Sequence, residues 1–141
     1  MPAFARFYDA IRHPRARALA TAEPVDGPLP DAPYVLLVTY KRSGEGVATP
    51  VWAARDGERL VFRTEVDTGK VRRIRHDPRV RVAPCSFRGR PKGPPVEARA
   101  RILGPADAIA ERLLAAKYGL RRCAYERVAP LGEMVYVEIT R

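Results

Sequence analysis

The stretch TEVDTGKVRRIRHDPRV, residues 64–80, places hydroxyl groups, a glycine and a lysine where a predicted strand meets a predicted helix. Backbone N–H groups at the start of a helix are unpaired and attract anions. Gly69 lets a ligand approach that backbone closely, and Lys70 supplies a positive charge with three donors. Thr64 and Thr68 add hydroxyl groups. The spacing predicts a phosphate site; a solvated helix that links two strands, with Lys70 as a surface residue, is the alternative.

Residues that carry most metal and nucleophilic chemistry are scarce. Cys85 and Cys123 have no CxxC spacing and are expected to be reduced thiols, with Cys85 buried and inert on an apolar strand. His13 and His76 have no clustered partners, so the sequence predicts no metal site. No carboxylate pair is placed for acid–base work, and the catalytic residues stay unknown. Chemistry is therefore expected to come from a bound cofactor.

The composition is that of one globular domain with an excess of positive charge. The chain has 141 residues, of which 46% are hydrophobic and 30% are charged. Its net charge of +10 predicts an anionic partner, and residues 63–101 alone hold 12 Lys or Arg against four Asp or Glu. Nucleic acid is disfavoured as that partner, because residues 72–101 contain only one aromatic side chain, Phe87, for stacking on bases. A simple preference for arginine in the composition is the alternative explanation.

Targeting signals are not evident in the sequence. No apolar run approaches the roughly 20 residues that cross a bilayer, so no membrane span is predicted. The N-terminal residues lack an apolar signal core with a small-residue cleavage site, which predicts a cytoplasmic protein. Residues 1–33 are expected to form an N-terminal helix, broken at Pro14, and a proline-rich arm. Residues 34–141 are expected to form the main domain.

Alternating hydrophobicity in that main domain predicts mostly strands. Strands are expected at 34–41, 47–54, 59–64, 79–87, 96–103 and 133–140. In the third of them, Leu60, Phe62 and Thr64 are expected on one face and Val61 on the other. A short helix is expected at 66–76, and a longer helix is expected to start at Pro105 and stop at Gly119. Six antiparallel strands in so short a chain predict a mainly β (α+β) fold, a small barrel with peripheral helices.

Several segments together resemble a known family. ATPVWAA, LVFRT, TGK, IRHDPRV, APCSFRGRPKGPPVEARARIL and RLLAAKYGL are similar to segments of the flavin- and deazaflavin-binding split β-barrel proteins that are related to pyridoxamine 5′-phosphate oxidase. In detail the sequence most resembles a subfamily of coenzyme F420-dependent enzymes. The resemblance implies a six-stranded antiparallel split β-barrel, also called an FMN-binding split barrel, for residues 34–141. It also implies a homodimer with the cofactor site between the two subunits.

The resemblance carries site residues over to this chain. The turn that binds the cofactor phosphate in the relatives would consist of Thr64, Thr68, Gly69 and Lys70. The segment beside the cofactor ring would consist of Thr49, Pro50, Val51 and Trp52. Packing of Trp52 in the barrel wall or at a dimer contact is the alternative to a cofactor contact.

Two positions depart from the oxidase relatives. Those relatives carry an arginine just before their lysine and another near the position of Thr49, whereas this chain has Gly69 and Thr49 there. The departure weakens the resemblance to an FMN-dependent oxidase of pyridoxamine phosphate. The resemblance therefore implies a reductase that transfers a hydride from reduced F420 to an unsaturated organic acceptor. An FMN-binding oxidoreductase of the same fold and a non-catalytic cofactor carrier are the alternatives.

Overall fold

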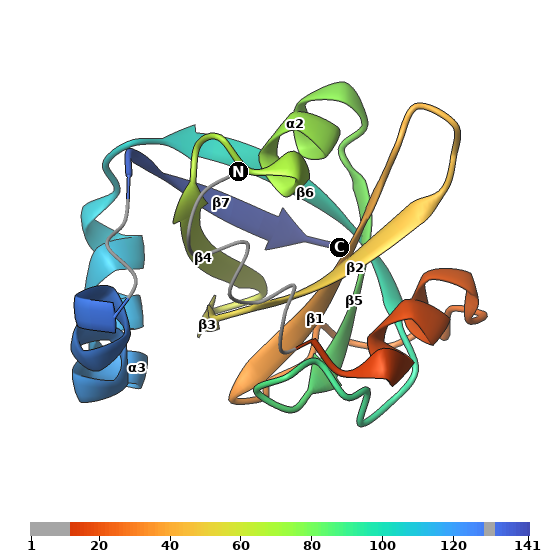
Figure 1. Cartoon of the computed structure of the whole chain (residues 1–141), viewed down its shortest axis with the longest axis horizontal. Coiled ribbons are helices and arrows are strands. Elements are labelled where there is room, and N and C mark those ends of the chain that lie inside the picture. Colours follow the sequence, from red (N-terminus) through yellow and green to blue (C-terminus); the bar gives the residue numbers. More distant parts are fainter. Residues whose placement is uncertain (1–11, 129–131) are drawn as a thin grey trace.

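The computed structural model describes residues 12–128 and 132–141 (Figure 1). The helices are the 3-10 helix η1 Pro14–Thr21 and the α-helices α2 Gly69–His76 and α3 Ala108–Val128. The strands are β1 Tyr34–Tyr40, β2 Gly46–Val51, β3 Ala53–Asp56, β4 Arg59–Glu65, β5 Arg79–Cys85, β6 Val96–Gly104 and β7 Met134–Thr140. The predicted N-terminal helix falls in part on residues 1–11, which lie outside the described residues.

The strands form one antiparallel sheet in the order β2-β1-β5-β6-β7-β4-β3. The sheet curls strongly, and the three helices lie around it (Figure 1). The helix α2 contacts β1 and β6, α3 contacts β3 and β4, and η1 contacts β1 and β2. The predicted mainly β fold of antiparallel strands with peripheral helices is confirmed.

The predicted number of six strands is wrong, because the segment expected to form one strand at 47–54 is divided at Trp52. Before this residue β2 pairs with β1, as far as Val51 opposite Val35. After it β3 pairs with β4, starting with Ala53 opposite Phe62. The two halves therefore lie at opposite edges of a seven-stranded sheet that hydrogen bonds do not close into a barrel. Alternation of side chains continues through the bend, so the sequence pattern does not reveal it.

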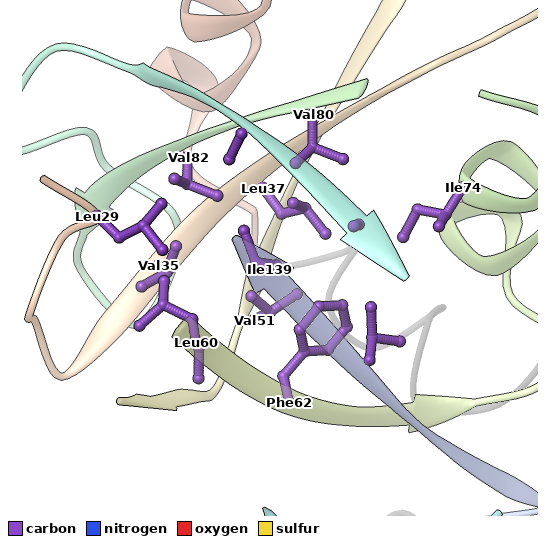
Figure 2. Close-up of a cluster of buried hydrophobic side chains, with 14 of the residues drawn as sticks. Leu29, Val35, Leu37, Val51, Leu60, Phe62, Ile74, Val80, Val82 and Ile139 are labelled. Carbon is purple, nitrogen blue, oxygen red and sulfur yellow. The ribbon is translucent and has the colours of Figure 1, made fainter. Parts of the chain in front are cut away.

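The main core lies inside the curled sheet and receives side chains from every strand. Phe62 is fully buried there, beside Leu60 of the same strand (Figure 2). Ile74 of α2 packs in the same cluster, and this contact holds the helix against the sheet (Figure 2). Val61 packs on the outer face in a cluster with α3, so the predicted division of β4 into two faces is confirmed. Because Thr64 has the same parity as Leu60 and Phe62, it faces inward.

The predicted limits of the longer helix need correction at both ends. Helix α3 begins at Ala108, three residues after Pro105, because the Asp107 carboxylate accepts the N–H of Ala110 at 3.0 Å and caps the helix start. At Gly119 the backbone leaves helical geometry, with φ 30° and ψ −109°, and a second helical stretch continues to Val128. Gly119 therefore ends the first stretch as predicted, but it forms a kink and not a stop.

The described part of the N-terminal arm packs closely against the sheet. Pro14 begins η1, and Ala16 and Leu19 of this helix are buried against the outer face of β1 and β2. Val25 bridges Val96 of β6, and Leu29 joins the main core. Within the described residues, no helix is both long enough and apolar enough to span a bilayer.

Candidate functional site

Lys70 is directed into the protein at the junction between β4 and α2. Only 7% of its surface is exposed, and its Nζ donates to Oγ1 of Thr64 at 3.1 Å. Val71 and Ile74 of the same helix are buried, which fixes the rotation of α2 and turns the start of the helix toward the sheet. A buried lysine is costly unless its charge is compensated. The structure thus brings Thr64 and Lys70 together and holds a cation at this end of the sheet.

Thr68 and Gly69 have different roles in this turn. Thr68 is the N-cap of α2, but its side chain makes no capping bond. Its buried Oγ1 instead donates to the backbone oxygen of Glu65 at 3.0 Å, which closes the turn. Gly69 leaves room for the side chain of Arg73, whose Nη1 would be 2.6 Å from a Cβ atom at position 69.

Arg73 and Thr39 belong to the same end of the sheet, and the sequence analysis did not identify them. Arg73 Nε donates to Oγ1 of Thr39 at 2.6 Å, and Thr39 is 99% buried on β1. Thr39 shares the inward face of β1 with Val35 and Leu37. A hydroxyl residue at an inward position of an otherwise apolar strand is a signal that could have pointed to it.

Thr49 lies diagonally opposite Thr39 across the β1–β2 ladder. The register pairs Thr49 with Leu37 and Thr39 with Val47. Val51 belongs to the main core, and alternation places Thr49 on the same inward face. Thr39, Thr49 and Thr64 therefore share the inward face of the sheet, and two of them, Thr39 and Thr64, accept hydrogen bonds from the cations Arg73 and Lys70. Hydroxyl groups and cations of this kind bind anionic oxygen atoms well.

Trp52 lies on the outer face, away from this group of residues. Trp52 packs against the hydrophobic cluster between the sheet and α3. Its ring centroid is 5.2 Å from that of Tyr118, with an interplanar angle of 30°. Tyr34 and Phe87 complete the group of rings at 6.0 and 6.2 Å from Trp52. Pro50 has the same parity as Trp52 and lies beside Gly89, where a Cβ atom would be 3.5 Å from Cγ of Pro50. Of the predicted cofactor-binding residues in the sheet, Thr49, Val51 and Thr64 face inward, whereas Pro50 and Trp52 lie on the outer face; Thr68, Gly69 and Lys70 belong to the start of α2.

Glu65 follows Thr64 directly and is also buried, with 5% of its surface exposed. Its Oε1 has no hydrogen-bond partner, while the backbone N–H of Gly132 donates to the carboxyl group. Burial raises the pKa of the Glu65 carboxyl group, and the nearby charge of Lys70 opposes that rise. A buried carboxylate with one unsatisfied oxygen destabilises the folded state.

Glu65→Gln should therefore make the protein more resistant to urea at neutral pH. The folded pKa of Glu65 lies above its ordinary value of 4.5. The contribution of this group to stability is therefore complete below pH 4.5 and is lost as the pH rises through the folded pKa. Urea unfolding of both proteins across the acid-to-neutral range should show a difference that grows with pH. Glu58→Gln, at an exposed position, should show no such trend; a pH-independent difference for Glu65→Gln would contradict the assignment.

Other chemistry is not evident in the described part of the chain. Cys85 is buried, as predicted, and burial raises the pKa of its thiol to about 12, so a reactive thiolate does not form at neutral pH. No group of three or more His, Cys, Asp or Glu side chains is arranged to hold a metal ion among the described residues. Two surface hollows of about 610 and 560 Å³ lie beside Arg59 and beside Arg17, and neither is lined by a predicted site residue.

Solved structures with a similar fold include proteins described as an F420 reductase, a heme storage protein and an FAD-binding protein. An F420 reductase is 22% identical, covers 82% of this chain and 94% of its own, and has a TM-score of 0.53. The heme storage protein HutZ from Vibrio cholerae is 10% identical, covers 99% and 90%, and has a TM-score of 0.57. An FAD-binding protein from Mesorhizobium loti is 18% identical, covers 89% and 86%, and has a TM-score of 0.50. At these identities the likeness shows the fold alone.

The sequence comparisons point the same way. No curated protein sequence matches this one significantly. The profile of the family described as pyridoxamine 5′-phosphate oxidase matches residues 5–141, which is nearly the whole chain. This protein therefore belongs to the pyridoxamine 5′-phosphate oxidase family.

Proposed function

We propose that the protein is an oxidoreductase that uses coenzyme F420 and transfers a hydride from its reduced form to an unsaturated organic acceptor. The observation that carries the proposal is the buried Lys70, held by Thr64 at the start of α2. An inward-facing cation that donates to a threonine hydroxyl at a helix start fits the phosphate group of such a cofactor. Thr64, Thr68 and Lys70, at the junction of β4 and α2, would hold that group, assisted by the backbone N–H groups around Gly69, and Thr49 of β2 would lie beside the cofactor ring.

The division of work between cofactor and protein follows from the residues present. Reduced F420 supplies the hydride when it is bound. The residues of this chain would bind the charged end of the cofactor, orient it against the sheet and keep water from the buried Lys70. Near Lys70, the carboxyl group of Glu65 has a raised pKa. Because its side chain is buried, the proposal assigns it no proton transfer.

The residues at two positions favour F420 over FMN as the cofactor. The resemblance to the oxidase relatives breaks down at Thr49 and Gly69, where they carry arginines. A solved F420 reductase shares the fold over 82% of this chain, which supports the proposal. FMN is the second candidate, because the family as a whole is described by an oxidase of pyridoxamine phosphate.

The proposal includes a homodimer with a shared cofactor site. The inward-facing residues Lys70, Thr64 and Thr49 line neither of the two surface hollows. A second subunit would supply the wall that encloses the cofactor ring. The exposed side chains Ile109 and Leu120 of α3, 52% and 88% exposed, offer apolar surface outside that site.

Titration of the purified protein with oxidised F420 and with FMN, side by side, tests the proposal. We expect saturable binding of F420, at least about tenfold tighter than that of FMN. Tighter binding of FMN, or binding of neither, would contradict the choice of F420. Oxidation of reduced F420 that depends on an added unsaturated acceptor would establish an enzyme. Binding without such turnover would instead indicate a cofactor carrier.

A further inference from the structure

A surface hollow at the start of η1 is lined by basic side chains. Its volume is about 560 Å³, and its wall is formed by Arg12, His13, Pro14 and Arg17. Binding sites for small ligands typically measure about 300–1,000 Å³, so this hollow has the size of a ligand site. None of these four residues belongs to the proposed cofactor site. A ligand bound there would therefore be separate from the cofactor.

The packing of η1 against the sheet turns its arginines toward solvent. Ala16 and Leu19 are buried against β1 and β2. In a 3-10 helix, which has three residues per turn, these two side chains lie above one another on a single face. Arg15 and Arg17 lie on either side of Ala16 in the chain and are exposed. The helix therefore presents two cations to solvent, and Arg17 is part of the wall of the hollow.

The loop at residues 86–92 is held against the start of η1 and brings further cations to it. The N–H of His13 donates to the backbone oxygen of Arg88 at 2.7 Å. Ser86 closes the loop through two bonds with Arg90: its N–H donates to the backbone oxygen at 3.0 Å, and its Oγ accepts the N–H at 3.0 Å. Arg88 and Arg90 are both exposed. The loop thus adds cations on an ordered backbone to those of η1.

Acidic residues do not balance the charge of these two segments. Residues 12–22 and 84–96 together contain five arginines, one lysine and no Asp or Glu. Within the described part of the chain, no ion pair involves Arg15, Arg17 or Arg90. Burial, followed by the positive charges of the two segments, lowers the pKa of the His13 imidazole. Cations that are held close together in this way attract a multivalent anion.

His13 adds a neutral donor to these charges. Its Nδ1 accepts the N–H of Arg15 at 3.1 Å. An imidazole nitrogen that accepts a hydrogen bond carries no proton, so in the neutral ring Nε2 carries the proton and can donate to a ligand. Arginine side chains bind phosphate oxygens through paired N–H donors. The hollow therefore combines guanidinium groups with a neutral donor, a set that fits the many oxygen atoms of linked phosphate groups.

A small ligand fits this surface better than a nucleic acid does. Single-stranded nucleic acids bind through bases that stack on exposed aromatic rings. Residues 12–33 contain no aromatic side chain. Phe87 of the loop is packed with other rings, 5.5 Å from Tyr34 and 6.2 Å from Trp52. A compact ligand with several negative charges is therefore favoured.

We propose that the hollow at the start of η1 is a binding site for a compound with two or three linked phosphate groups. Arg17 of η1 and Arg90 of the loop would bind the phosphate oxygens, and His13 would supply the neutral donor. Free inorganic polyphosphate and the triphosphate of a nucleotide share this chemistry. The site goes beyond the proposed function, because it requires neither F420 nor a second subunit.

Calorimetric titration of the purified protein with inorganic tripolyphosphate, without divalent cations, tests the proposal. We expect saturable binding at one site per chain, at least about tenfold tighter than that of orthophosphate at equal ionic strength. Titration with ATP identifies the source of the phosphates. Tighter binding of ATP than of tripolyphosphate would indicate a nucleotide, whereas equal or weaker binding would indicate an inorganic ligand.

Arg17→Met and Arg90→Met should each weaken tripolyphosphate binding by about fivefold or more. Both side chains are exposed, so the variants should keep the native fold, which urea unfolding checks. Arg112→Met is the matched control, since Arg112 is exposed on α3, at the opposite end of the molecule from η1 (Figure 1). This variant loses the same charge and should bind tripolyphosphate as the native protein does.

Absence of saturable tripolyphosphate binding would overturn the proposal, and so would unchanged affinity in both Arg17→Met and Arg90→Met. Equal losses in these two variants and in Arg112→Met would also overturn it, because they indicate a response to net charge alone. A single-stranded oligonucleotide that binds more tightly than tripolyphosphate, and loses affinity in Arg17→Met and Arg90→Met, would replace the small ligand by a nucleic acid.

Discussion

Lys70→Met should weaken F420 binding by about ten- to a hundredfold, the largest effect on binding that we expect from any single substitution. The substitution keeps most of the aliphatic stem but removes a buried charge that donates to Thr64 at 3.1 Å. A hydrogen bond from a charged group contributes roughly 1.5–3 kcal/mol, and each 1.4 kcal/mol corresponds to a factor of ten in affinity. Fluorescence titration with oxidised F420 measures the change.

Lys41→Met is the matched control for Lys70→Met. Lys41 is an exposed lysine whose Nζ is 3.1 Å from Glu45 in a surface ion pair of little energetic value. Lys41→Met removes the same charge from the same residue type as Lys70→Met, but at a position outside the proposed site. Its affinity for F420 should therefore stay at the native level. An unchanged affinity of Lys70→Met would show that the phosphate does not bind at the start of α2. Equal losses in both variants would show that only the net charge of the protein matters.

Phe62→Ala should destabilise the protein by about 3–5 kcal/mol, the largest effect on stability that we expect. Phe62 is fully buried at the centre of the main core, so its removal leaves a cavity between β4 and the strands around it. Since a domain of this size is typically stable by only 5–15 kcal/mol, the variant would be close to unfolding. Urea unfolding followed by the fluorescence of Trp52, the single tryptophan, measures the loss.

Leu120→Ala provides the comparison for Phe62→Ala. Leu120 is 88% exposed on α3, so its truncation removes little buried surface and should change stability by less than about 0.5 kcal/mol. If Phe62→Ala were as mild as Leu120→Ala, the inward direction of β4 would be wrong. The direction of Thr64, which shares that face, would then be wrong as well.

The alternation of β4 shows how much of the fold the sequence determines. Leu60 and Phe62 alternate with Val61, and this period of two predicts a strand with one buried face whatever its neighbours are. The same reasoning predicted the strands around Val80 and Val96, and the i, i+3 spacing of Val71 and Ile74 predicted the short helix before Asp77; the structure contains them all. These features depend on residues close together in the chain, so they can be predicted from local patterns.

The bend at Trp52 shows what local patterns miss. Within residues 47–54, Val51 and Ala53 point into the same core, yet β2 pairs with β1 and β3 pairs with β4. Which partner a strand takes depends on hydrogen bonds to segments far away in the sequence. The pattern of residues 47–54 alone therefore predicts one strand where the structure has two, and six strands where the sheet has seven.

The candidate site, like the fold, combines features that the sequence determines with features that only the tertiary structure determines. The sequence by itself determined the types and order of the residues around Lys70, and so the kind of ligand that this turn can attract. The tertiary structure alone decided that Lys70 faces Thr64, that Arg73 reaches Thr39, and that Trp52 lies on the other face. The physical reason is that the direction of α2 depends on the burial of Val71 and Ile74 against strands that are distant in the chain.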